Sequence, residues 1–146
     1  MIVDSHCHLD MIAERDDLDA VVARAREVGV ATMLTISTKL SNVARIRSIA
    51  EHYHDVWAAV GVHPHEASNE GQTAPDAVVA AAQHPRVIAI GESGLDYHYH
   101  FASKDAQRAN FRAHIQAAQQ TGLPLVVHAR EADDEVAEIL NEEHAN

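Results

Sequence analysis

The sequence contains one cysteine, few aromatic residues and half as many basic as acidic side chains. A single cysteine excludes an intrachain disulfide, so a reducing, cytoplasmic location is expected. The formal net charge of −11 argues against a broad basic surface for duplex DNA or an anionic membrane. Neither a long apolar run nor a basic leader is present, so no membrane span and no signal peptide are expected.

What the sequence does contain is an aliphatic core and an excess of histidine. Hydrophobic residues make up 47% of the chain but aromatic ones only 4%, a balance typical of an Ala, Val, Ile and Leu core in an α/β protein. The length of 146 residues predicts one domain, residues 1–146. Twelve histidines are present, and their positions decide which of them can carry chemistry. No feature predicts an obligate protein partner.

Short apolar runs alternate along the chain with amphipathic stretches. Among the latter, Lys104–Thr121 predicts a helix that stops at Gly122, and Ser41 is expected to cap an earlier helix. The expected strands are Ile2–Ser5, Ala31–Ser37, Val56–Val62, Val87–Gly91 and Leu125–His128. Repeated β-then-α units predict parallel strands with right-handed crossovers. An open doubly wound sheet and a (β/α) barrel both fit, although no phosphate-binding glycine loop follows the first strand.

The sharpest chemical signal is the pair His6 and His8. Residues two apart on a strand point to the same side, so both imidazoles can bind one metal ion, while Cys7 faces the other way as a small buried residue. Two hydrogen-bonded core histidines are the alternative interpretation of the pair.

Further ligand types stand where later strands are expected to end. His63 and His65 follow the third strand, Glu92 the fourth, and His128 closes the fifth. In a parallel α/β protein these ends lie on one face, where the active site is found. The sequence therefore predicts a metal site from His6, His8, Glu92 and His128, in which the two oxygens of Glu92 can bridge two cations.

Other polar residues carry weaker signals. His63 or His65 could orient substrate or support a ligand, or could be structural. Arg130 could meet a substrate phosphate or carboxylate, or form a salt bridge at a helix start. The segment Asp96–His98 could line the site or pack as an ordinary loop. Exposed positions on helices are expected for His52, His54, His84, His114 and His144.

Four of these segments together resemble the TatD family of metal-dependent hydrolases, among the amidohydrolase-like barrels. They are Asp4–Asp10, Gly61–His65, Gly91–Tyr97 and Pro124–Arg130, and they occur in the family's order and at its spacing. The resemblance implies a parallel (β/α) barrel of the TIM type, of which about five of eight βα units are present. The chain is accordingly expected to be the N-terminal portion of such a domain, truncated at its C-terminal end.

The resemblance also implies an activity and roles for the site residues. The expected reaction is phosphodiester hydrolysis in DNA, as a deoxyribonuclease that often acts as a 3′–5′ exonuclease on single strands. Two divalent metal ions (Mg, Mn or Zn) are implied, one on His6, His8 and Glu92 and the second on His128 and the shared, catalytic Glu92. His63 and Arg130 would then bind the scissile phosphate.

The family pattern places another histidine ligand after the sixth strand and an aspartate after the eighth, in regions that this sequence lacks. The aspartate is expected to help deprotonate the attacking water. Three hypotheses follow: a two-metal phosphodiesterase; a hydrolase of a small cyclic amide, lactone or aminated base; and a metal-binding chain without activity. The two hydrolase hypotheses use the same ligands, so the sequence separates them poorly.

Overall fold

The computed structural model describes residues 1–145. Its five strands are β1 (Ile2–Cys7), β2 (Val30–Ile36), β3 (Val56–Val60), β4 (Val87–Asp96) and β5 (Leu125–Arg130). The helices are α1 (Leu9–Ile12), α2 (Leu18–Glu27), α3 (Val43–His52), α4 (Pro75–Ala82), α5 (Lys104–Thr121) and α6 (Asp133–Glu142). Two short 3₁₀ turns, η1 (Leu40–Asn42) and η2 (Pro64–Glu66), complete the order. None of the helices within residues 1–145 is long and apolar enough to cross a membrane.

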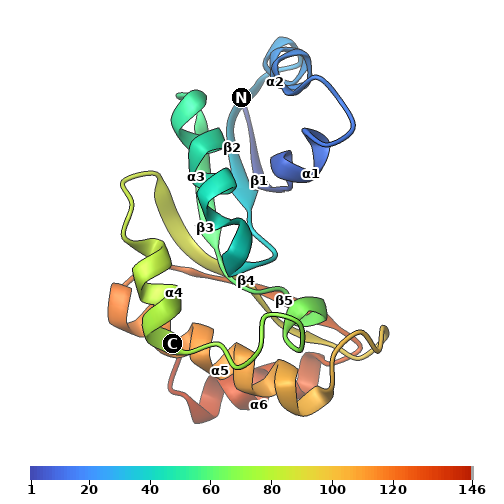
Figure 1. Cartoon of the computed structure of the whole chain (residues 1–146), viewed down its shortest axis with the longest axis vertical. Coiled ribbons are helices and arrows are strands. Elements are labelled where there is room, and N and C mark those ends of the chain that lie inside the picture. The colour runs from blue at the N-terminus through green and yellow to red at the C-terminus, as the bar shows by residue number, and fades with distance from the viewer. Residues whose placement is uncertain (146) are drawn as a thin grey trace.

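The strands form one sheet in the order β1-β2-β3-β4-β5, and every neighbouring pair is parallel. Each new strand is added beside the previous one. A doubly wound sheet reverses direction at a switch point, so the strand order confirms the barrel-type prediction. The sheet curls into a half-barrel, and in Figure 1 α5 and α6 lie along β4 and β5 while α1 to α3 accompany the first strands.

Apolar side chains cover both faces of the sheet. The main core lies between the sheet and the helices, where Ile46, Val56, Val60 and Ile90 are fully buried. On the other face, Ile36, Ala59 and Ala89 form a small cluster of their own. Because side chains alternate along a strand, Ala59 faces away from Val60 and toward the interior of the curl. The helices thus hold the sheet from outside and leave its strand ends free to carry polar groups.

Helix boundaries follow the predicted signals in one case and depart from them in another. Helix α5 spans Lys104–Thr121 as predicted, with Gly122 at φ 69° in the left-handed conformation after its last turn. The prediction that Ser41 caps a helix is wrong. Ser41 lies in η1, and its hydroxyl donates to Glu70 Oε1 at 2.6 Å, so α3 begins only at Val43.

Strand β4 is longer than predicted, and Glu92 lies within it rather than at its end. Two glycines allow this course, Gly91 at φ 126° and Gly94 at φ 144°. A Cβ atom on Gly91 would lie 2.5 Å from the carbonyl oxygen of Val126, and one on Gly94 would overlap the carbonyl oxygen of His128. The backbones of β4 and β5 therefore approach closely beside Glu92, and the strand continues to Asp96.

The prediction that His114 is exposed is also wrong. His114 lies on the buried face of α5, where its Nε2 accepts the backbone N–H of Val62 at 2.9 Å and its Nδ1–H donates to the carbonyl of Asn110 at 2.8 Å. Asn110 in turn donates to the carbonyl of Val62 at 2.8 Å. These bonds tie α5 to the segment after β3 that leads into His63.

His114 predicts a specific pH dependence of stability. Burial lowers its pKa from 6.5 to about 4, so between these values the unfolded chain binds a proton that the folded chain does not. Stability therefore falls as pH decreases through this window, by about 1.4 kcal/mol per pH unit. Urea unfolding at pH 7 and at pH 5 measures this effect. Between these pH values, the free energy of unfolding of His114→Gln should fall by about 2 kcal/mol less than that of wild type.

The exposed His52 provides the matched control, since its side chain is 69% accessible. His52→Gln should keep the wild-type dependence on pH. Equal losses for wild type and His114→Gln would show that His114 does not cause the acid destabilisation.

Candidate metal centre

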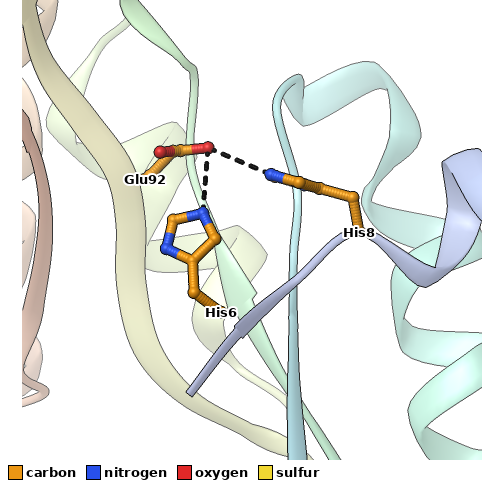
Figure 2. Close-up of side chains that lie close together, drawn as sticks. All are labelled: His6, His8 and Glu92. Atoms are coloured by element: carbon orange, nitrogen blue, oxygen red, sulfur yellow. Dashed lines mark ion pairs between the residues drawn. The ribbon is translucent and has the colours of Figure 1, made fainter. Parts of the chain in front are cut away.

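The Glu92 carboxylate is the centre of a cluster of imidazoles. Its side chain is 6% exposed, and its Oε1 atom lies 3.4 Å from Nε2 of His6 and 3.4 Å from Nε2 of His8. Figure 2 shows both rings, carried at the end of β1, pointing at the same carboxylate oxygen. The alternation that was expected of His6 and His8 is confirmed, although β1 itself ends at Cys7.

Two further histidines approach Glu92 from neighbouring strands. His128, in β5, places Nδ1 3.6 Å from Oε2, and His63, just after β3, places Nε2 4.0 Å from Oε1. Two groups of candidate ligand atoms result, His6, His8 and Glu92 on one side and His63, Glu92 and His128 on the other, each within 4.8 Å. The structure thus brings together all four residues that the sequence predicted as ligands.

Hydrogen bonds indicate which ring nitrogens are free to bind a cation. Nδ1–H of His8 donates to the carbonyl of Ile36 at 2.9 Å, so a neutral ring turns the lone pair of Nε2 toward Glu92. Nε2–H of His128 donates to Asp96 at 3.0 Å, which turns the lone pair of Nδ1 toward Glu92. A lone pair facing a carboxylate is repelled unless a proton or a cation lies between them. The donor set therefore fits a metal ion on each side of Glu92.

The electrostatics of the cluster agree with this arrangement. Burial would raise the pKa of Glu92, but the nearby rings of His128 and His8, which can bond the carboxylate when they carry a proton, hold that pKa well below its usual range. Glu92 in turn raises the pKa of His8 and of His128, against the effect of burial, because a proton between ring and carboxylate relieves the same repulsion that a cation would relieve. Glu92 is therefore an anion that gathers positive charge around it.

His63 differs from the other histidines of the cluster. Its Nδ1 accepts the backbone N–H of His65 at 3.1 Å, so the neutral ring carries its proton on Nε2, the atom that faces Glu92. Burial lowers the pKa of His63 to about 4, which keeps the ring neutral. In this tautomer His63 is a hydrogen-bond donor rather than a metal ligand, as its predicted role in holding substrate requires.

Asp96 has a role that the sequence left open. Its buried carboxylate accepts hydrogen bonds from Nε2 of His65 at 2.7 Å and Nε2 of His128 at 3.0 Å, and from the backbone N–H groups of His98 and Tyr99. Although burial would raise the pKa of Asp96, these bonds lower it to about 2. Asp96 thus fixes the ring of His128 and the tautomer that directs Nδ1 at Glu92.

Two other residues singled out in the sequence lie away from Glu92. Arg130 is exposed, and its guanidinium carbon lies 4.7 Å above the ring of Tyr99. Cys7 packs against the main core, where its thiol donates to the carbonyl of Leu34 at 3.3 Å and burial raises its pKa to about 12. The cysteine therefore faces away from the histidines on either side of it, as expected.

Comparison with known proteins identifies the family. The model of the family described as "TatD related DNase" matches residues 3–146. The chain belongs to the TatD family. It is 38% identical over 124 residues to a Klebsiella pneumoniae protein named "3'-5' ssDNA/RNA exonuclease TatD". The aligned residues cover 85% of this chain and 47% of that protein. It is 34% identical over 145 residues to the Bacillus subtilis protein "Uncharacterized metal-dependent hydrolase YabD", covering 99% of this chain and 57% of the relative.

The fold agrees with that of a solved TatD homologue. The crystal structure of YJJV from Escherichia coli superposes with a TM-score of 0.89 at 28% identity, over 97% of this chain and 56% of that one. The chain thus spans about half the length of the relatives it matches.

The role of Asp96 predicts a loss of metal affinity on substitution. Asp96→Asn removes an oxygen that accepts from His65 and His128 and should weaken binding of Mn²⁺ or Zn²⁺ about 10- to 100-fold, the usual effect of removing the partner of a metal-binding histidine. Calorimetric titration of the purified chain measures this directly.

Asp55 is a matched control, because it is also a buried carboxylate with a charged partner, Arg26 at 2.6 Å. Asp55→Asn should reduce stability but leave the metal affinity unchanged. Equal affinity in Asp96→Asn and wild type would exclude the positioning role of Asp96.

Proposed function

We propose that this chain supplies the metal centre of a TatD-like hydrolase that cleaves phosphodiester bonds with two divalent metal ions. The observation that carries the proposal is the buried Glu92 carboxylate, whose Oε1 faces Nε2 of His6 and His8 while its Oε2 faces Nδ1 of His128. Carboxylates that bridge two cations a few ångströms apart are characteristic of hydrolases of phosphate esters.

The residues of the chain divide the work between binding and orientation. His6, His8 and one oxygen of Glu92 would hold the first cation, and His128 with the other oxygen would hold the second. Two cations held there would supply a water nucleophile near neutral pH and stabilise the charge on the attacking and leaving oxygens. Glu92 is the catalytic residue in this scheme because its carboxylate would hold both cations. No serine or cysteine nucleophile is needed.

His63 is suited to hold the phosphate. Its side chain is 12% exposed, and Nε2, which carries the ring proton in this tautomer, lies 4.0 Å from Oε1 of Glu92. A neutral N–H donor at this place can bond a non-bridging phosphate oxygen without competing for the metal. His65 holds His63 in this tautomer through its backbone N–H.

The substrate we propose is single-stranded DNA or another single-stranded nucleic acid, cleaved as a 3′–5′ exonuclease. Support comes from the Klebsiella pneumoniae relative, which carries that activity in its name. The formal net charge of −11 is compatible with this substrate because bound cations reverse the charge at the centre itself.

A pair of double variants tests the proposal. His6→Ala/His8→Ala should reduce the number of bound metal ions from two to one. It should also lower the rate of hydrolysis of a 3′-labelled single-stranded oligonucleotide by about 100-fold or more. The control, His52→Ala/His54→Ala, removes two exposed histidines with the same spacing and should change neither measurement.

A panel of cyclic amides and lactones, assayed beside the oligonucleotide, extends the test. Activity confined to the panel would contradict phosphodiester hydrolysis. Metal binding without turnover of either substrate would contradict the enzymatic proposal for this chain and support the metal-binding hypothesis instead.

A further inference from the structure

Two aromatic side chains are exposed in the loop that follows β4. Tyr99 is 39% and Phe101 64% accessible, and their rings stack at a centroid distance of 5.5 Å with an interplanar angle of 22°. Burying either ring would be favourable, yet the loop keeps both at the surface. Tyr99 and Phe101 are called the aromatic platform below.

The aromatic platform is anchored to the metal centre by direct contacts. The ring of His65 meets Tyr99 edge-on at 5.4 Å and Phe101 at 4.9 Å. His65 is bonded to Asp96, which also accepts the backbone N–H of Tyr99 at 3.0 Å. Since Asp96 orients His128 as well, one buried carboxylate fixes both a candidate metal ligand and the platform.

The rings of the cluster continue this connection toward Glu92. His65 packs edge-on against His63 at 4.4 Å, and His63 against His128 at 4.5 Å. A base bound on the aromatic platform would therefore be separated from His63, whose Nε2 is proposed to bind the phosphate, by the ring of His65.

A positive charge borders the aromatic platform. The guanidinium of Arg130, at the end of β5, lies 4.7 Å from the ring centre of Tyr99. Among residues 1–145 no carboxylate lies within ion-pair distance of Arg130, in contrast to Arg108 and Arg112 on α5. Its charge is thus available to an anion that approaches the rings.

Exposed aromatic rings beside a cation form the recognition pattern for single-stranded nucleic acids, in which bases stack on rings and phosphates meet the cation. A duplex keeps its bases stacked inside and cannot use such a surface. Because Arg130 lies over Tyr99, the more exposed ring of Phe101 offers the face on which one base can stack beside that cation.

We propose that the aromatic platform is a base-binding subsite, on which a nucleobase of a single strand stacks while Arg130 binds a phosphate next to that base. This inference rests on the proposed function and extends it by naming the residues that select a single strand. The same stacking accepts any base, so the subsite favours single strands without reading their sequence.

The test removes either the base or the rings. The chain, loaded with Mn²⁺, is titrated with a short phosphorothioate-linked strand and with matching strands that carry an abasic nucleotide at each position in turn. For wild type, the Kd should rise about 5- to 150-fold at the position that occupies the platform, the range expected for stacking of one base. Tyr99→Leu/Phe101→Leu, which keeps apolar volume but removes both rings, should bind the intact and abasic strands equally.

Two further variants keep the result interpretable. Phe101→Leu alone changes a side chain that is 64% exposed, so it should fold normally and lose part of the discrimination. Trp57→Leu alters an aromatic ring that also has an arginine beside it, Arg86 at 4.9 Å, but lies near the start of β3, away from the site. It should discriminate as wild type does.

The outcomes separate this inference from the proposed function. If wild type hydrolyses the unmodified strand but binds abasic and intact strands equally, the subsite is refuted and the hydrolase proposal stands. The subsite is also refuted if Tyr99→Leu/Phe101→Leu distinguishes intact from abasic strands as strongly as wild type does. A wild-type chain that neither binds nor cleaves single strands contradicts the proposed function itself and, with it, the subsite.

Discussion

The structure depends on one electrostatic constraint, a buried carboxylate surrounded by the lone pairs of imidazoles. Glu92 is buried, and the tautomers of His8 and His128 direct unprotonated nitrogens at its two oxygens. Burying such a group without compensation costs several kcal/mol. The carboxylate and the lone pairs repel one another unless positive charge lies between them. Two bound divalent cations would supply that charge. The other features of the site maintain this arrangement.

The sheet supplies the geometry for that constraint. Parallel strands β1, β4 and β5 deliver His6, Glu92 and His128 to one end of the half-barrel. His8 follows β1 directly, and His63 lies in the segment after β3. Close approach of β4 to β5 requires glycine at positions 91 and 94. Asp96, four residues after Glu92 on the same strand, then holds the ring of His128 from its far side. Fold and site are thus specified by overlapping segments of the sequence.

Much of this could be predicted from sequence, because period-2 alternation fixes the direction of His6 and His8 and βα repeats bring strand ends together. The length of β4 could not be predicted, because glycine usually weakens or ends a strand. Here Gly91 and Gly94 instead allow the strand to continue past Glu92. Alternation extended from Glu92 to Asp96 would have placed both carboxylates on one face. The burial of His114 and the contacts of Tyr99 and Phe101 with His65 depend on tertiary packing, which no local pattern encodes.

The most direct measurement is anomalous diffraction from crystals of this chain grown with Mn²⁺. Two peaks are expected at about 2.0–2.2 Å from the oxygens of Glu92, one bonded to Nε2 of His6 and His8 and the other to Nδ1 of His128, with His63 outside bonding distance of both. Absence of peaks beside Glu92, or a single ion bound through Nε2 of His63, would contradict the bridging role of Glu92 and the donor role of His63.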